Sequence, residues 1–273
     1  SVMAEITSAG GRAVVEVADV SSVEAADRLI DRCVAEYGSI DGLVNNAGYG
    51  MIDTSAPEAQ DPAELRRVFE VNVFGTAYCG MAAMRQMIRQ GGGSIVNDTS
   101  AAMAGTQRLG AYSASKGAAA SLTLSWAVDL GGTGVRVNGV SPMAVTRAWD
   151  WSLVPDRNVL PRADRLQPEE NTGMVVYLLS DRAAGVHGQL ITLRGGDLSL
   201  ICHPAAVEPV LNRPQWTAEV VAEAFGSELA GALQPLGMGR VRLEHVDRTA
   251  GRSGDRGGVD TKSRTEDEDG TGQ

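Results

Sequence analysis

Short apolar runs alternate with longer amphipathic segments along the first 200 residues. We predict strands at residues 13–20 (AVVEVADV), 42–46, 91–100, 135–142 and 188–196. Apolar residues at helical spacing predict helices between them, at 23–36, 62–89, 112–130 and 168–180. Strands that alternate with helices of ten or more residues specify a parallel sheet with helices on both faces. We therefore expect an α/β fold with a doubly wound parallel sheet.

The alternation is lost past residue 200. The stretch HPAAVEPVLNRPQW at 203–216 carries three prolines and is not one regular element, whereas 217–229 reads as a helix capped by Thr217. From Gly251 to Gln273 the only large apolar residue is Val259, so burial cannot offset the entropy of ordering this segment. We divide the chain into an α/β domain at 1–200, a C-terminal extension at 201–248 and a disordered tail at 249–273.

Charge and composition exclude several classes of partner. The chain has 273 residues and a net charge of -10, from 24 Lys plus Arg against 34 Asp plus Glu, which repels nucleic acid and anionic membrane surfaces. The 3 cysteines form no CxxC pair and the 3 histidines have no zinc-ligand spacing, so we expect no metal site. Without a run of about 20 apolar residues, we expect a cytoplasmic protein.

One pair of residues points to proton-transfer chemistry. Tyr112 and Lys116 are four residues apart at the start of a predicted helix, one turn from each other. An ammonium there favours the phenolate and lowers the tyrosine pKa, which would make the phenol a usable general acid or base. This spacing is common on ordinary helix surfaces, but only 2 of the 24 basic residues are lysine, and Lys116 is the only one before the predicted tail.

Five motifs in a fixed order resemble the short-chain dehydrogenase/reductase family. They are VNNAG at 44–48, the asparagine of VNVFG at 72, the strand SIVNDTS ending at Ser100, YSASK at 112–116 and VNGVSP at 137–142. The resemblance covers roughly residues 3 to 200. It implies a Rossmann-type fold and transfer of hydride between a nicotinamide cofactor, NAD or NADP, and a secondary alcohol or ketone.

The resemblance also implies roles for single residues. Tyr112 would exchange a proton with the substrate oxygen, Ser100 would hydrogen-bond that oxygen, and Lys116 would hold the nicotinamide ribose. Asn72 would interrupt its helix and keep a water in the proton relay. The residues implied to line the cofactor, besides Tyr112 and Lys116, are Asp19, Val20, Asn46, Ala47, Gly48, Pro142 and Thr146. Open α/β sheets bind ligands at the edge where these segments lie.

Several of these residues have plainer interpretations. Ser100 lies twelve residues before Tyr112, where the family more often has thirteen, and could instead cap a turn together with Thr99. Asn72 could be a solvated helix residue, although apolar neighbours flank it. Asp19 could simply cap the helix that follows it, and Ser21 or Ser22 could do the same.

A finer resemblance concerns the substrate. Met143 replaces the usual glycine after Pro142, and with the sequence around 188–216 this resembles the (3R)-hydroxyacyl-CoA dehydrogenase branch of the multifunctional β-oxidation enzymes. Residues 149–165 would form the substrate loop. Its Trp149 and Trp151 suggest an apolar or acyl-bearing substrate, or else merely pack the loop down.

The sequence contains no glycine-rich turn between a first strand and a helix, which is where the pyrophosphate rests in sites of this kind. By the resemblance, the first βαβ unit is missing and the chain is N-terminally truncated. We expect residues 1–273 alone to bind cofactor weakly or not at all, to show negligible turnover and to aggregate. The alternative function is therefore a catalytically incompetent remnant, serving at most as a homo-oligomer subunit through helices 62–89 and 112–130.

Overall fold

The structure is a computed structural model, and it describes residues 2–50, 56–144, 167–194 and 196–237. Contacts divide the chain into two compact units, Ser1–Arg242 and Leu243–Gln273, and every described residue belongs to the first. The predicted disordered tail at 249–273 lies outside the described residues. No described helix is both long and apolar enough to cross a membrane.

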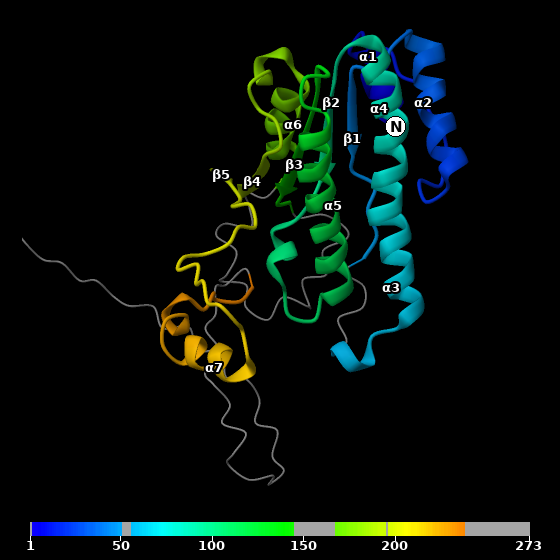
Figure 1. Cartoon of the computed structure of the whole chain (residues 1–273). Helices are drawn as coiled ribbons and strands as arrows, with labels where there is room; N and C mark the ends of the chain where they lie inside the picture. Colours follow the sequence, from blue (N-terminus) through cyan, green and yellow to red (C-terminus); the bar gives the residue numbers. More distant parts are fainter. Residues whose placement is uncertain (1, 51–55, 145–166, 195, 238–273) are drawn as a thin grey trace, which may run out of the picture. The chain divides into compact units, whose positions relative to one another are not determined.

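A five-stranded sheet forms the centre of the fold (Figure 1). Its strands, in their spatial order, are β1 (Gly42–Asn45), β2 (Gly93–Asp98), β3 (Val135–Pro142), β4 (Leu190–Arg194) and β5 (Asp197–Leu200). The first four run parallel, and β5 is antiparallel to β4. The parallel strands confirm the α/β fold class, because each of them is joined to the next through a helical crossover.

Helices lie on both faces of this sheet. The larger core joins α2 (Val23–Tyr37) and α4 (Thr76–Gln90) to the face of β2 that carries Ile95. On the opposite face, Val96 of the same strand packs with Leu178 of α6 (Thr172–Leu179). Successive side chains of a strand point to opposite faces, so one fully buried strand serves both cores. The remaining helices are α1 (Val2–Ser8), α3 (Pro62–Phe69), α5 (Gly110–Asp129) and α7 (Ala218–Gly226).

Local sequence signals place several helix ends. The Ser22 side chain accepts a hydrogen bond from the Ala25 amide at the start of α2, so Ser22 is the cap of this helix and Asp19 is not. Gly38 ends α2 with a φ of 89°, a left-handed conformation that glycine adopts without strain. Thr217 caps α7 as the sequence predicts.

The predicted strand at 13–20 is wrong. These residues form no regular element, and Val17 is 91% exposed. A strand is stabilised by a hydrogen-bonded neighbour, and among the described residues β1 pairs with β2 alone. The valine-rich run is not paired with the open edge of β1, so it lacks the hydrogen-bonded neighbour that a strand needs.

Two other elements differ from the sequence prediction. The helix predicted at 62–89 is three segments, because a π-helical stretch at Glu70–Gly75 separates α3 from α4. The strand predicted at 188–196 ends at Arg194, and Asp197–Leu200 returns beside it as β5. The antiparallel return was not foreseen, since glycines at 195 and 196 read as the end of a strand rather than the turn of a hairpin.

Candidate active site

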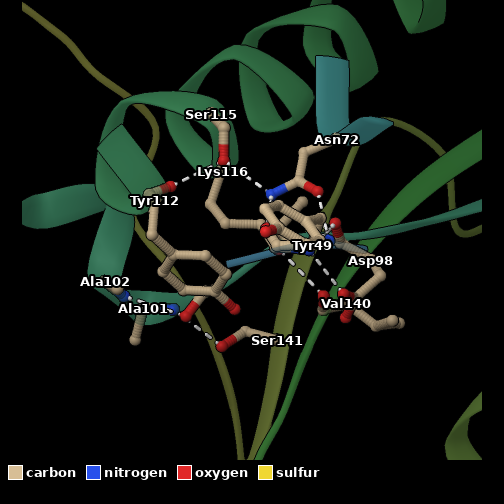
Figure 2. Close-up of polar contacts among 12 residues, drawn as sticks. Tyr49, Asn72, Asp98, Ala101, Ala102, Tyr112, Ser115, Lys116, Val140 and Ser141 are labelled. Atoms are coloured by element: carbon tan, nitrogen blue, oxygen red, sulfur yellow. Dashed lines mark hydrogen bonds and ion pairs between the residues drawn. The ribbon is translucent and has the colours of Figure 1, made fainter. Parts of the chain in front are cut away.

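The carboxyl ends of β2 and β3 bring the candidate residues together. Ser100 lies two residues after the end of β2 and caps the 3-10 helix Ala101–Ala104. The Ala101 amide donates a hydrogen bond to the Ser141 hydroxyl near the end of β3, at 2.8 Å, which ties the segment after β2 to the neighbouring strand. Helix α5 then begins at Gly110, so its first turn carries Tyr112 over this edge of the sheet (Figure 2).

Lys116 is buried at this edge and is paired with a carboxylate. Only 3% of the residue is exposed, and its ammonium donates to the Asp98 carboxylate at 2.6 Å and to the Asp98 carbonyl at 3.1 Å. Figure 2 shows the Lys116 side chain running from α5 toward Asp98. Burial raises the pKa of Asp98, and the Lys116 ammonium opposes that rise. Each buried charge therefore has its partner.

The Tyr112 phenol is held protonated. Burial and, second, the negative charge of Asp98 raise its pKa to about 12, against a hydrogen bond with the Ser100 side chain that lowers it. The Lys116 ammonium lies 5.6 Å from the centre of the Tyr112 ring. The sequence-based expectation that the Tyr112 pKa is lowered is therefore wrong for this structure, because burial and, second, the charge of Asp98 raise it.

Asn72 links two segments that lie far apart in the sequence. It sits in the π-helical stretch between α3 and α4 and is 2% exposed, so the interpretation as a solvated residue is wrong. Its side-chain oxygen accepts from the Tyr49 amide at 2.7 Å, and its nitrogen donates to the Tyr49 carbonyl and to the Ser115 hydroxyl, both at 2.9 Å. Ser115 in turn donates to the Tyr112 carbonyl at 2.8 Å. Asn72 thus fastens the segment after β1 to the first turn of α5.

The Ser100 side chain has two hydrogen-bond partners. Its hydroxyl accepts a hydrogen bond from the Ala102 amide at 3.1 Å, which makes it the cap of the short helix after β2. The same side chain hydrogen-bonds Tyr112. A spacing of twelve residues therefore still brings the two hydroxyl groups together.

The segment Asn46-Ala47-Gly48 lies beside these residues. A Cβ atom built on Gly48 would be 3.8 Å from the Asn72 side-chain oxygen and 3.9 Å from the Lys116 ammonium. Pro142 ends β3, next to Ser141. Gly48 and Pro142 therefore lie at the sheet edge that carries Lys116 and Ser141, where open α/β sheets bind ligands, and the polar groups there fit hydroxyl ligands.

Asp19 and Val20 approach the site from the side of α3 and α4. Val20 packs on Gly75 so closely that a Cβ atom there would be 2.7 Å from a Val20 methyl group. Hydrogen bonds from Ser21 lower the pKa of Asp19, and the positive charge of Arg67 adds to this effect. The Arg67 guanidinium also lies 4.5 Å from the centre of the Tyr49 ring, in the segment that Asn72 holds.

Some predicted residues lie outside the described part of the chain. They are Thr146 and the substrate loop at 149–165, with Trp149 and Trp151. Within the described residues, no cluster of three or more His, Cys, Asp or Glu side chains could hold a metal ion.

Sequence reasoning missed Asp98, Ser115 and Tyr49. Asp98 is the last residue of an otherwise buried strand, and a carboxylate in that place requires a partner. The motif SIVNDTS therefore contains a signal for Asp98. The sequence contains no signal for the hydrogen bond from Asn72 to Ser115, because that bond depends on how α5 packs against the π-helical stretch.

Comparisons with known proteins agree with this geometry. A sequence model of the family described as enoyl-(acyl carrier protein) reductase matches residues 1–197. Cis-4-hydroxycyclohexanecarboxylate dehydrogenase of Sinomonas cyclohexanicum is 37% identical over 195 residues, which is 69% of this chain and 78% of the relative. The 7alpha-hydroxysteroid dehydrogenase of Escherichia coli is 34% identical over 202 residues, covering 71% of this chain and 78% of that one.

Solved structures give the same result. A short chain dehydrogenase from Mycobacterium avium superposes with a TM-score of 0.71 at 30% identity, over 89% of this chain and 79% of its own. An NAD+-bound xylitol dehydrogenase has a TM-score of 0.66 at 31% identity, over 71% of this chain and 83% of its own. The chain belongs to the short-chain dehydrogenase/reductase family, a family of oxidoreductase enzymes.

Proposed function

We propose that the protein transfers hydride between a nicotinamide cofactor, NAD or NADP, and a secondary alcohol or ketone. The observation that carries this proposal is the meeting of Tyr112, Ser100 and the buried Lys116 at the carboxyl edge of a parallel sheet. Relatives named as dehydrogenases of hydroxyl compounds and as a 3-oxoacyl-[acyl-carrier-protein] reductase support it.

The chain's own residues would divide the work at the substrate oxygen. The bound cofactor would supply or accept the hydride. Tyr112 would give its phenolic proton to the carbonyl oxygen during reduction and take it back during oxidation. Ser100, which already hydrogen-bonds Tyr112, would orient that oxygen. The Lys116 ammonium has three N–H donors, and two of them bond Asp98. The third would hold the ribose hydroxyls.

The remaining candidates would shape the cofactor site. Asn46, Ala47 and Gly48 would pass the cofactor along the carboxyl edge of the sheet, Pro142 would line it too, and Thr146 would meet its nicotinamide side. Asn72 would keep the segment at Tyr49 in place and support the proton relay. Asp19 and Val20 would border the adenine. The substrate we propose is apolar or acyl-bearing, with a 3-hydroxyacyl thioester of the branch named above as the finer candidate.

The test is an absorbance assay of NADH and NADPH at millimolar concentration, which separates chemistry from the weak cofactor binding expected of this chain. The probes are a 4-oxocyclohexanecarboxylate, a 7-oxosteroid and a 3-oxoacyl thioester. We expect consumption of one cofactor with at least one probe, and a loss of about 100-fold or more in Tyr112→Phe. Turnover that survives Tyr112→Phe would contradict the assignment. No turnover with any probe and no saturable cofactor binding would instead favour the incompetent remnant, which binds no cofactor.

We further propose that the chain forms a homo-oligomer through the helices at 62–89 and 112–130. Phe74, Met81 and Ile88 recur at intervals of seven on the first of these segments and are exposed, and Val128 of α5 is 80% exposed. Apolar side chains in such a row are typical of a helix-packing surface. Light scattering of the wild type should give a mass above 28.6 kDa, which Met81→Glu should reduce.

A further inference from the structure

The C-terminal extension comes back to the segment that joins Ser100 to Tyr112. It leaves the sheet through β5, and its described part ends at Gly237 (Figure 1). A Cβ atom built on Gly237 would be 2.9 Å from the Gly105 carbonyl oxygen, and one built on Gly105 would be 3.8 Å from the Gly237 Cα atom. The backbones of the two glycines are therefore in contact.

Glycine suits both sides of this contact. The φ angle is +101° at Gly105 and +67° at Gly237, in a region that residues with a side chain seldom adopt. A Cβ atom 2.9 Å from a carbonyl oxygen is too close, so a larger residue at 237 would push the extension away from Gly105. The glycine pair thus lets the extension lie directly on this segment.

Gly105 is one short helix away from the candidate active site. It ends the 3-10 helix Ala101–Ala104, which Ser100 caps at the other end, and its amide donates to the Ala102 carbonyl at 2.9 Å. This short helix packs against α5, whose first turn carries Tyr112. Figure 2 shows Ala101 and Ala102 beside the Tyr112 side chain. The end of the extension therefore adjoins the segment that supplies both hydroxyl groups of the site.

The last described residues of the extension carry an apolar strip, Leu233 and Leu236. Leu233 is 54% exposed, and Leu236, the neighbour of Gly237, is 56% exposed. Leu233 has φ -58° and ψ 126°, near the polyproline II conformation, which Pro235 also favours in itself and in Gln234. Residues three apart lie on the same side of such a helix, roughly 9 Å from each other along its axis. The two leucines therefore face one way.

A substrate whose oxygen binds Ser100 and Tyr112 places its remaining carbon atoms against a neighbouring surface. Ligand sites commonly combine a few polar groups with an apolar lining. The strip at Leu233 and Leu236 offers such a lining next to Gly105. Because the strip is narrow and extended, it fits a linear alkyl chain better than a broad ring system.

We propose that Leu233 and Leu236 bind the acyl chain of a 3-oxoacyl or 3-hydroxyacyl substrate and select for its length. This inference rests on the proposed function, because it names the part of the substrate that the extension recognises. The strip lies beyond residue 197, where the match to the family model ends, so the selectivity belongs to the extension. Proton transfer stays with Tyr112, and hydride transfer stays with the cofactor.

The first experiment detects binding at the strip without any turnover. Leucine methyl groups of the full chain are labelled with ¹³C, and the Leu236 signals are assigned by their absence in Leu236→Ser. The probes are the N-acetylcysteamine thioesters of 3-oxodecanoate and 3-oxobutanoate. We expect the decanoyl probe to shift the Leu236 signals saturably, and the butanoyl probe to leave them in place because its chain is too short to reach the strip.

Leu200 of β5 is the internal control, since it is exposed to a similar extent, 64%, and lies at the other end of the extension. Its signals should not move with either probe. Leu236 signals that stay in place with the decanoyl probe would overturn the proposal. Equal shifts at Leu200 and Leu236 would also overturn it, because they would show that the probe coats any exposed leucine.

The second experiment measures the dissociation constants of both probes from the same titrations, followed on the Leu233 signals. Leu236→Ser should weaken binding of the decanoyl probe by about 5-fold or more, because apolar contact with the chain is lost. Gly237→Ala should also weaken it, since the added Cβ atom displaces the strip from Gly105. The matched controls are Leu200→Ser and Gly231→Ala, where a Cβ atom would meet nothing within 4 Å, and both should stay within a factor of about two of the wild type.

Turnover of the two probes separates this inference from the proposed function. Equal kcat/KM for the decanoyl and butanoyl probes in an active protein would refute selection by the strip and leave the proposed function standing. Saturable shifts of Leu236 without turnover of any probe would keep the acyl site and refute the proposed function. If neither shifts nor turnover were observed, both would fail.

Discussion

Replacing Asn72 with alanine tests whether the site is held together by one buried side chain. Asn72→Ala removes three hydrogen bonds, two of them to the backbone of Tyr49. Ser115 keeps its bond to the Tyr112 carbonyl, so the loss falls on the amide and carbonyl of Tyr49. A buried polar group left without a partner costs about 1–3 kcal/mol. Tyr49 is half-buried and water can reach part of it, so we expect a loss of about 3 kcal/mol for both groups together.

Urea unfolding followed by circular dichroism measures this loss. For a slope of about 2–3 kcal/mol per molar urea, the midpoint should fall by roughly 1 M. Arg66→Ala is the control, because Arg66 lies on the neighbouring helix α3, is 79% exposed and makes only a 4.0 Å contact with Glu70. It should change stability by less than about 1 kcal/mol. If Asn72→Ala also stayed within about 0.5 kcal/mol of the wild type, the reasoning about its hydrogen bonds to Tyr49 would be refuted.

Three further predictions concern other parts of the chain. Gly134 has a φ of +80°, and a Cβ atom there would be 2.4 Å from the Gly91 carbonyl oxygen. Gly134→Ala should therefore lower the free energy of unfolding, measured in urea, by about 2–4 kcal/mol. The control is Gly173→Ala, which should not destabilise the protein because a Cβ atom there would meet nothing within 4 Å. The pKa of Tyr112 rises from 10.0 to about 12 on folding. The contribution of this shift to the free energy of unfolding is therefore complete below pH 10 and is lost as the pH rises toward 12. The difference in unfolding free energy between wild type and Tyr112→Phe should therefore shrink by about 1 kcal/mol from pH 9 to pH 11, and a constant difference would contradict the raised pKa. Calorimetry with a polypeptide of these 273 residues should give a dissociation constant for NAD(H) weaker than micromolar, because the sequence has no glycine-rich turn for the pyrophosphate, and micromolar affinity would reveal another phosphate site.

The sequence by itself determined the fold class and the candidate residues. The apolar pattern predicts β1 to β4, because a buried parallel strand needs a run of apolar residues wherever it lies in space. Local signals such as Ser22, Gly38 and Thr217 set helix ends for reasons that involve only neighbouring residues. The same local pattern failed at 13–20, where a valine-rich run has no partner strand in the structure.

The tertiary structure alone decided how the candidate residues act on one another. The spacing of Tyr112 and Lys116 is a property of one helix, but the charge that Tyr112 experiences depends on Asp98, eighteen residues from Lys116 and on a different element. Likewise, Asn72 reaches Ser115 across 43 residues only because the π-helical stretch packs against α5. Electrostatic and hydrogen-bond energies depend on distance in space and on exclusion of water, and neither quantity is written in the order of residues.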